Sequence, residues 1–435
     1  MPSTPNEPSA RTSRRSLLRG GAAAAATALG APYVKAGRAF RPGGEEMLRV
    51  GLVGCGGRGR GAAYNALMAD PNVQLVALAD TFPEPLADAL KYLSERPELA
   101  GKVDVPEDRQ FVGFDAYEKL IEVCDVVLLA TSPHFRPQHM AACVAANKHM
   151  FVEKPVATDP AGIRSIWKTC EEARAKGLNV VSGLCYRYEF GKQETIRRIH
   201  DGMIGDIVSM QTTYNTGGLW HRGNKPEWST MEYQIRNWLY FAWLSGDLIT
   251  EQHIHSLDKI AWAKGSYPVK ATASGGRSQR TQEQYGNIFD HFNTVYEWED
   301  GVRGFSSCRQ WSGAASDVSD YVYGTKGTAA IQAHRIQVGD EKWRHRGEGP
   351  DDMYQNEHNA FFAAIRSGEV IDNGDYMCES TLMAIMGRMA AYTGQTVTRE
   401  QVLASELDLA PKAYAWGDVE AAYLDVAVPG VTPFV

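Results

Sequence analysis

LRVGLVGCGGRGRG, residues 48–61, is the stretch that decides the predicted fold. A short apolar run ends in glycines, and a helix-like pattern follows at 62–67. Gly54, Gly56 and Gly59 fit the spacing G-x-G-x-x-G. In that motif the first glycine allows a tight turn, the second lets the backbone approach a pyrophosphate, and the third lets the helix pack on the strand. The stretch therefore predicts a strand–turn–helix unit that binds a dinucleotide.

The residues around the last glycines are placed to bind phosphate. The N-terminus of the helix offers free N–H groups and the positive end of its dipole, and Gly57 and Arg58 belong to this loop. A second apolar run, 73–79, ends at Asp80, 21 residues past the third glycine, where an acid meets the adenosine ribose hydroxyls. A 2′-phosphate beside Asp80 would be repelled, which favours NAD, while Arg58 and Arg60 leave NADP open.

Length and composition place the chain among ordinary soluble globular proteins. With 435 residues, 44% of them apolar, two domains are expected. The net charge of −7 disfavours non-specific binding to nucleic acid. No membrane partner is expected, because beyond the N-terminus no stretch is apolar enough to span a bilayer. The seven cysteines are widely spaced, which argues against a disulfide framework and predicts buried thiols.

The first 36 residues have the pattern of a signal peptide. The basic segment 13–18, SRRSLL, resembles the twin-arginine export signal, and a weakly apolar region with small residues follows it. We therefore expect a periplasmic protein that is exported already folded. Because no soluble nicotinamide pool is expected there, a dinucleotide enzyme would have to hold its cofactor tightly, without a covalent bond.

A continuous apolar run at 125–130 predicts a strand buried on both faces of a parallel sheet. Ligands bind beyond the carboxyl ends of such strands. The turn that follows should therefore line the nicotinamide side of the cofactor. The cofactor-binding residues expected from this region are Thr131, Ser132 and Pro133, with His139 in the helix predicted at 136–146.

A further strand, 148–152, ends in Glu153-Lys154-Pro155. This tripeptide, its lead-in AANKHM at 145–150 and the upstream glycine loop resemble the glucose–fructose oxidoreductase/inositol dehydrogenase family (Gfo/Idh/MocA). The resemblance implies that Lys154 points at the substrate carbinol, that Glu153 steadies the site near the nicotinamide, and that a cis peptide precedes Pro155. A lysine beside the cofactor is suited to proton transfer.

The predicted fold class is an α/β Rossmann domain followed by an α+β domain with a large, mostly antiparallel sheet. The expected boundaries are 1–36 for the signal, 47–180 for the Rossmann domain, 181–395 for the second domain and 396–435 for a C-terminal tail. In the resembling family such a sheet mediates oligomers, so a homodimer or homotetramer is expected.

Three aromatic or basic residues of the second domain are candidates for binding substrate. The resemblance implies that Tyr186 or Arg187 lies near the substrate or the nicotinamide amide, although an arginine bonded to backbone at the domain junction is an equal alternative. Trp220 lies in a predicted loop with several polar residues, where it could stack on a sugar or close the core.

The segment 245–258 supplies the remaining candidates for catalysis. If it is one helix, Glu251, His255 and Asp258 share a face at i, i+4 and i+7. By resemblance His255 relays the proton of the oxidised hydroxyl, with Glu251 orienting it. His253 raises the alternative of a metal site, but residues two apart on a helix point to different faces, so no metal is expected.

Three functions are compatible with these features. The first is an exported NAD(P)-dependent oxidoreductase that acts on a hydroxyl of a small sugar or polyol. The second is an NAD-dependent glycoside hydrolase or lyase that oxidises a sugar transiently, eliminates a glycosidic group and reduces the sugar again. The third is a non-catalytic sugar-binding protein on the same scaffold, against which Lys154 and His255 argue.

Overall fold

The structure, a computed structural model, describes residues 44–347, 349–419 and 425–435. Within these ranges the chain belongs to a single compact unit that spans 38–435. The predicted signal, 1–36, lies outside the described residues.

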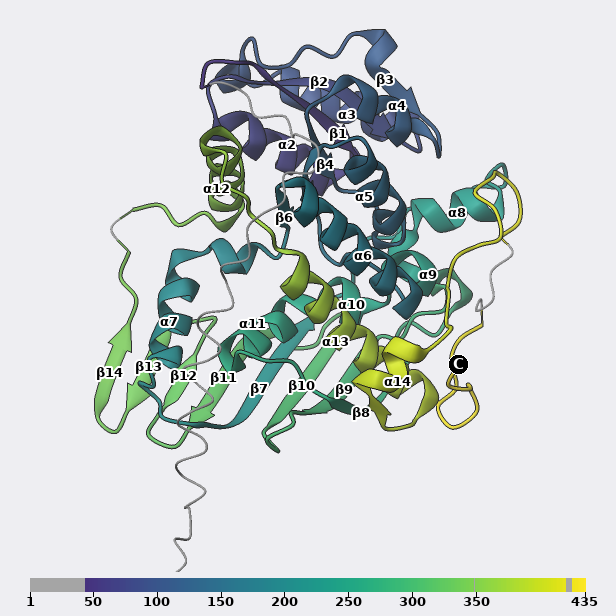
Figure 1. The fold of residues 1–435 in the computed structure, drawn as a ribbon. Helices are drawn as coiled ribbons and strands as arrows, with labels where there is room; N and C mark the ends of the chain where they lie inside the picture. The colour runs from purple at the N-terminus through teal and green to yellow at the C-terminus, as the bar shows by residue number, and fades with distance from the viewer. Residues whose placement is uncertain (1–43, 348, 420–424) are drawn as a thin grey trace, which may run out of the picture. The chain divides into compact units, whose positions relative to one another are not determined.

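The N-terminal half is built on a six-stranded parallel sheet (Figure 1). The strand order is β3-β2-β1-β4-β5-β6, so the order reverses between β1 and β4, where an open α/β sheet binds its ligand. This confirms the predicted Rossmann fold. The strands are β1 (Leu48–Val53), β2 (Val73–Asp80), β3 (Gln110–Val112), β4 (Val126–Leu129), β5 (His149–Val152) and β6 (Val180–Ser182).

Helices cover both faces of this sheet, as the continuous burial of its central strands requires: all four residues of β4 and of β5 are buried. The helices are α2 (Gly57–Ala69), α3 (Pro83–Ser94), α4 (Ala116–Val123), α5 (Arg136–Ala145) and α6 (Pro160–Lys176). Short 3-10 turns precede β3 and α5, at η1 (Pro97–Leu99), η2 (Glu107–Arg109) and η3 (Pro133–Phe135).

The second half contains a nine-stranded sheet in the order β14-β13-β12-β11-β7-β10-β9-β8-β15. All pairs are antiparallel except β7 with β10, which confirms the expected mostly antiparallel sheet. Three outer strands, β13, β14 and β15, were not predicted. The strands are β7 (Ile207–Thr216), β8 (Lys270–Gly276), β9 (His291–Glu297), β10 (Arg303–Gln310), β11 (Asp317–Gly324), β12 (Thr328–Ala330), β13 (Arg335–Val338), β14 (Glu341–Arg344) and β15 (Val397–Thr398).

Helices α11 and α13 pack on the large sheet, and α12 returns to pack beside α2 (Figure 1). The returning helix brings residues of the second half to the glycine turn. The helical elements of this half are η4 (Cys185–Tyr188), α7 (Phe190–His200), α8 (Thr230–Arg236), η5 (Trp238–Tyr240), α9 (Ala242–Ser245), α10 (Leu248–Glu251), α11 (Ile254–Lys264), η6 (Glu283–Tyr285), α12 (Met353–Ser367), α13 (Gly374–Thr393) and α14 (Arg399–Ala404).

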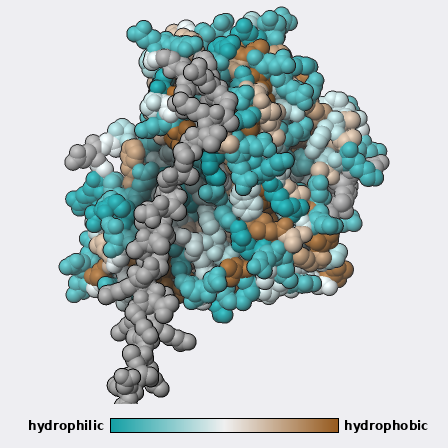
Figure 2. Space-filling view, in the orientation of Figure 1, coloured by the Kyte–Doolittle hydropathy of each residue, from teal (hydrophilic) through white to brown (hydrophobic). Residues whose placement is uncertain are grey.

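The surface and core agree with the composition. On the face shown in Figure 2, hydrophilic residues predominate among the described residues, and hydrophobic surface is confined to separate patches. All seven cysteines are free and buried, as predicted. Within the described ranges, no helix has both the length and the apolarity needed to cross a bilayer.

Candidate active site

The turn between β1 and α2 has the geometry that the glycine motif predicts. Gly54 has a φ of 93°, and a Cβ on it would lie 2.6 Å from backbone atoms of the turn after β4. A Cβ on Gly59 would collide with the carbonyl oxygen of Gly54, so the helix can pack closely only without one. By contrast, among the described residues no heavy atom beyond the adjoining backbone lies within 4 Å of the Cβ positions of Gly56 and Gly57. The first turn of α2 therefore borders open space, as a bound pyrophosphate requires.

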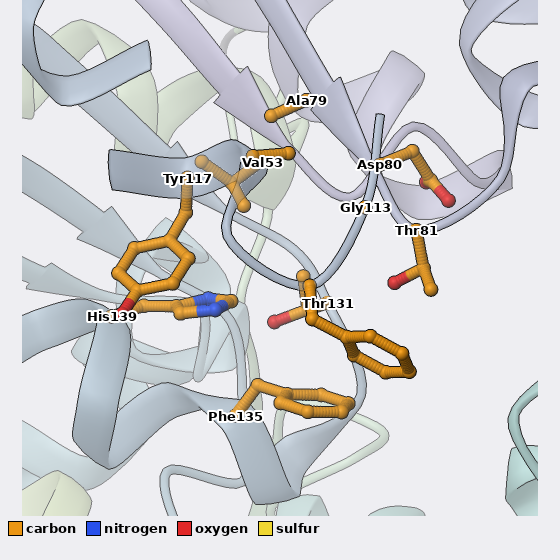
Figure 3. A pocket seen from close by; sticks show the side chains of 11 residues that line it. Val53, Ala79, Asp80, Thr81, Gly113, Tyr117, Thr131, Phe135 and His139 are labelled. Carbon is orange, nitrogen blue, oxygen red and sulfur yellow. The ribbon is translucent and has the colours of Figure 1, made fainter. Parts of the chain in front are cut away.

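A pocket beside this turn collects part of the predicted cofactor set (Figure 3). Asp80 ends β2 and Thr81 follows it, Thr131 lies in the turn after β4, Phe135 ends η3, and His139 lies in the first turn of α5. The Asp80 carboxylate accepts a hydrogen bond from the backbone N–H of Cys55 at 2.7 Å, which ties β2 to the glycine turn. Burial raises the pKa of Asp80. The remaining lining residues are Val53, Ala79, Gly113, Phe114, Ala116 and Tyr117.

Two polar atoms of this pocket have no partner. Oγ1 of Thr131 and Nδ1 of His139 are buried and form no hydrogen bond to any described residue. The His139 ring lies 4.2 Å from Tyr117 and 5.9 Å from Phe135, centroid to centroid. Burial lowers the pKa of His139 to about 3, so its imidazole is neutral. A ribose would supply the hydroxyls that these atoms lack.

The turn after β4 was expected on the nicotinamide side, but Thr131 shares this pocket with Asp80. The reason is topological: β1 lies between β2 and β4, so their terminal loops meet at one edge. Ser132 and Pro133 begin the 3-10 turn η3, and the Ser132 carbonyl accepts the Phe135 N–H at 3.2 Å.

Tyr414 and Trp416 of the C-terminal tail pack against residues that line the pocket, although the sequence suggested no role for the tail. The Tyr414 hydroxyl and Nε2 of His134 lie 2.8 Å apart in a hydrogen bond. The Trp416 ring packs on Phe82 at 5.5 Å and on Phe114 at 4.9 Å. The tail thus joins the loops that follow β2, β3 and β4.

A charged cluster lies on the other side of the glycine turn. Arg58, in the first turn of α2, forms ion pairs with Glu153 after β5 and, at 2.8 Å, with Glu357 of α12. Its guanidinium also lies 4.5 Å from the Tyr354 ring centroid. Burial opposes ionisation, but the two carboxylates outweigh it and raise the pKa of Arg58. Burial raises the pKa of Glu357 well above its usual value. Arg58 therefore links the glycine loop to the Glu-Lys-Pro tripeptide.

Lys154 joins this cluster to the second domain. Its Nζ donates hydrogen bonds to the carbonyl oxygen of Glu251 at 2.5 Å and to Oε1 of the same residue at 2.9 Å. Both side chains keep 16% of their surface exposed, so the pair remains accessible. The peptide between Lys154 and Pro155 is cis, as the resemblance implied.

The segment around His255 differs from the single helix that was expected. Helix α10 ends at Glu251 and α11 begins at Ile254, so Glu251 does not share a helical face with His255 and Asp258. Glu251 therefore holds Lys154 rather than orienting His255. Nδ1 of His255 is buried without a hydrogen-bond partner among the described residues. Burial, reinforced by the nearby Lys154 ammonium, lowers the pKa of His255 well below its ordinary value, so the ring is neutral.

Tyr186 and Arg187 have different surroundings. The Tyr186 ring stands edge-on to His255 at 5.2 Å, which places it beside the proposed proton relay. Arg187 forms an ion pair of 2.7 Å with Asp258 and lies 4.1 Å from the Tyr376 ring centroid. The structure thus gives Arg187 the contacts of a domain-junction arginine.

Two other candidates lie outside the Lys154 cluster. Trp220 is 40% exposed, and its ring contacts are Trp238 at 6.2 Å and the Arg222 guanidinium at 4.9 Å. His253 is fully buried, and its Nε2 hydrogen-bonds Oγ of Ser306 at 2.7 Å. In the part of the chain that the structure describes, no group of three His, Cys, Asp or Glu residues could hold a metal ion.

Three contributors to the cluster were missed by the sequence interpretation: Arg136, Glu357 and Tyr354. The signal available for Glu357 was a carboxylate on the same helical face as apolar residues such as Phe361 and Ile365, the buried face of α12. Nothing local marked the other two, because their contacts join elements that are far apart in sequence.

The residues present fit a dinucleotide. An unfilled space at the helix N-terminus, a pocket with an acid and two polar atoms that lack a partner among the described residues, and a charged cluster all lie at the carboxyl ends of the strands. The first would take the pyrophosphate, the second the adenosine, and the third the nicotinamide and the substrate.

Comparisons with known proteins agree with a dinucleotide-binding Rossmann domain followed by a second domain. Residues 48–180 match the family model described as "Oxidoreductase family, NAD-binding Rossmann fold", and residues 193–330 match the "GFO/IDH/MocA C-terminal domain". A "Glycosyl hydrolase family 109 protein 1" of Bacteroides fragilis is 29% identical over 172 residues, which are 39% of this chain and 35% of that protein. The "Inositol 2-dehydrogenase" of Rhizobium meliloti is 24% identical over 75% of this chain and 92% of its own length.

A solved structure has the same fold. The scyllo-inositol dehydrogenase of Lactobacillus casei "with bound cofactor NAD(H) and scyllo-inositol" aligns with a TM-score of 0.62 and 19% identity, over 82% of this chain and all of that one. The chain spans little more than half the length, or less, of several other curated proteins that it matches.

Proposed function

Because the chain belongs to the Gfo/Idh/MocA family of NAD-binding oxidoreductases, we propose that it oxidises or reduces a hydroxyl carbon of a sugar or polyol, outside the cytoplasm, with a tightly held NAD. The main support is that the glycine loop and the Glu-Lys-Pro tripeptide, which are far apart in sequence, meet in one cluster. Arg58 of the glycine loop pairs with Glu153, and the next residue, Lys154, pairs with Glu251 of the second domain.

The reacting end has the groups that hydride transfer needs. A nicotinamide ring, when bound, supplies the hydride acceptor. The Lys154 ammonium, held by two oxygens of Glu251, would lie at the substrate hydroxyl and stabilise negative charge on its oxygen. The neutral imidazole of His255 would accept the hydroxyl proton. Tyr186, edge-on to that ring, limits the orientations that it can adopt.

The adenosine end supports tight, non-covalent retention of the cofactor. The tail fixes the loops after β2, β3 and β4 through the Trp416 and Tyr414 contacts. Trp416→Ala should therefore release the dinucleotide faster, by roughly tenfold if one aromatic contact of about 1 kcal/mol is lost. The measurement is the dinucleotide left after prolonged dialysis. Equal retention in wild type and variant would show that the tail does not contribute to retention of the dinucleotide.

The test of the main proposal is direct. The purified protein is denatured in acid, and the released dinucleotide is identified by mass spectrometry. The intact protein is then assayed for NADH formation on a panel of sugars and polyols. Co-purifying NAD and turnover of a hydroxyl substrate are expected. A preparation that neither contains nor binds NAD or NADP would overturn the proposal.

A redox-neutral reaction is the second candidate, because one relative carries the name of a glycosyl hydrolase family. The same Lys154 and His255 would oxidise a sugar transiently, allow a glycosidic group to leave, and reduce the sugar again. Stoichiometry separates the two functions. Glycoside cleavage without net NADH would favour the second, whereas an absolute need for added NAD would exclude it.

Export and assembly complete the proposal. SRRSLL at 13–18 supports the twin-arginine route, and replacing Arg14 and Arg15 by lysine should keep the protein in the cytoplasmic fraction. Among the described residues, β10 and β11 of the large sheet expose the aromatic side chains of Phe305, by 49%, and Tyr321, by 39%, which supports a homodimer or homotetramer. Light scattering of wild type and Phe305→Asp measures the assembly.

A further inference from the structure

Arg136 is a buried cation whose position points to the substrate. It is the first residue of α5 and follows the turn that closes β4. Only 2% of its surface is exposed. The last residue of β4, Leu129, accepts the N–H of Glu153 at 2.9 Å, so this turn lies beside the Glu-Lys-Pro tripeptide. Burial lowers the pKa of the guanidinium, although the carboxylates of Glu153 and Glu251 favour its charged form. The guanidinium therefore belongs to the reacting end of the site.

The guanidinium of Arg136 lacks the partners that other buried cations have. Its Nε and Nη1 are enclosed and form no hydrogen bond to any described residue. Lys259, in contrast, is fully buried with Asp320 at 2.5 Å, and Lys192 is buried with Glu189 at 2.5 Å. A guanidinium has five donors and no acceptor of its own, so burial without acceptors is costly.

The neighbouring carboxylates are already engaged. Glu153 pairs with Arg58, and Glu251 pairs with Lys154 at 2.9 Å. Burial lowers the pKa of Arg136 to about 10, which still leaves it charged at neutral pH. The positive charge of Arg136 is therefore not neutralised through a hydrogen bond from Nε or Nη1 to any described side chain.

We propose that Arg136 binds a carboxylate of the substrate, so that the preferred substrate is a sugar acid whose carboxylate lies near the oxidised hydroxyl. This rests on the proposed function, because the reacting end must receive the substrate. Carboxylate is the chemistry that a guanidinium binds best, through two parallel N–H···O bonds. It brings the acceptors that Nε and Nη1 lack and neutralises the unpaired charge.

Binding, rather than turnover, tests the proposal. The dinucleotide-loaded protein is titrated by calorimetry, at constant ionic strength, with D-gluconate and D-glucuronate and with their neutral analogues D-glucitol and D-glucose. Wild type should bind one acid roughly 10- to 100-fold more tightly than its neutral analogue, the range expected for a charged hydrogen-bond pair. Arg136→Gln should lose that preference and keep the affinity for the neutral compound.

Controls separate this role from folding. Arg136→Lys keeps the positive charge but lacks the paired N–H donors of a guanidinium. It should therefore retain part of the preference for the acid. Arg388 is 1% exposed, has an unpartnered Nη2 and bonds the Gly246 carbonyl at 3.1 Å through Nη1. It lies on α13, so Arg388→Gln should leave the preference unchanged. Circular dichroism establishes that each variant is folded.

Three results would overturn the role of Arg136. Wild type could bind acid and neutral compound equally, or Arg136→Gln could weaken both equally. A folded Arg136→Gln could also lose its dinucleotide, which would assign the guanidinium to the cofactor and leave the proposed function standing. Absence of any dinucleotide in wild type would instead overturn the proposed function, while the comparison of acid with neutral sugar would remain decisive for Arg136.

Discussion

The two ends of the proposed cofactor site are built by different means. The adenosine end, with Asp80, Thr131 and His139, is a pocket of loops from one sheet, closed by aromatic rings of the tail. The reacting end is a charged cluster in which Arg58 and Lys154 each reach carboxylates of other elements. One end depends on shape and apolar contact, and the other on charges brought together from two domains.

This difference separates retention of the cofactor from catalysis. Substitutions at the adenosine end should change retention of the dinucleotide and stability, with catalysis affected only through cofactor loss. Substitutions at the reacting end should change catalysis in protein that is still loaded. The predictions below test this separation, beginning with the largest effect.

Lys154→Met should lower kcat by roughly 10²- to 10⁴-fold, because it removes the ammonium that acts on the reacting oxygen. Its dinucleotide content should stay at the wild-type level. Steady-state kinetics and acid release of the dinucleotide measure the two quantities. Lys148→Met is the matched control, since that ammonium bonds the Cys124 carbonyl at 2.6 Å. Full activity in Lys154→Met would show that Lys154 does not act on the reacting oxygen and would refute the proposed reacting end.

Gly54→Ala and Gly56→Ala should separate folding from binding at the turn that both ends share. Gly54 has a positive φ and no room for a Cβ, so alanine should cost about 2 kcal/mol or more of stability. Gly56 borders open space, so alanine there should leave Tm nearly unchanged but lower the dinucleotide content. Thermal unfolding and dinucleotide release are the measurements. Similar Tm losses in both variants would contradict this assignment.

The buried imidazole of the adenosine end should make stability depend on pH. The folded pKa of His139 is about 3 against an ordinary 6.5, so below 6.5 the unfolded chain binds more protons than the folded one. The contribution of His139 to stability should therefore fall as pH drops, by roughly 2 kcal/mol between pH 7 and pH 5. His139→Phe keeps a ring beside Tyr117 and should lose less stability over that range. Identical denaturant midpoints at both pH values would refute the neutral, buried state.

Asp80→Asn should produce the smallest change, a loss of roughly tenfold in preference for NAD over NADP. The amide removes the charge that repels a 2′-phosphate but keeps an acceptor for the Cys55 N–H, which now lies 2.7 Å from the carboxylate. Titration of dinucleotide-free protein with NAD and with NADP gives the ratio. An unchanged ratio would mean that Asp80 only braces the glycine turn.

Much of the first domain could be predicted because its signals are local. A glycine that needs a positive φ, such as Gly54, and buried runs such as 125–130 act through residues close in sequence. The strand ends then place Asp80 and Lys154 on the carboxyl edge of the sheet. The expected helix through Glu251 and His255 failed because the periodicity of the segment contains no sign of the break between α10 and α11.

The sequence by itself determined a dinucleotide-binding Rossmann domain, a second domain with a large mostly antiparallel sheet, and the tripeptide that carries Lys154. Only the tertiary structure decided which charges meet: Arg58 with Glu357, 299 residues apart, and Lys154 with Glu251, 97 residues apart. It alone left Nε and Nη1 of Arg136 without a hydrogen bond to any described residue. The physical reason is that backbone preference and burial depend on short stretches of the chain. An ion pair depends instead on the relative positions of two elements that are far apart in sequence.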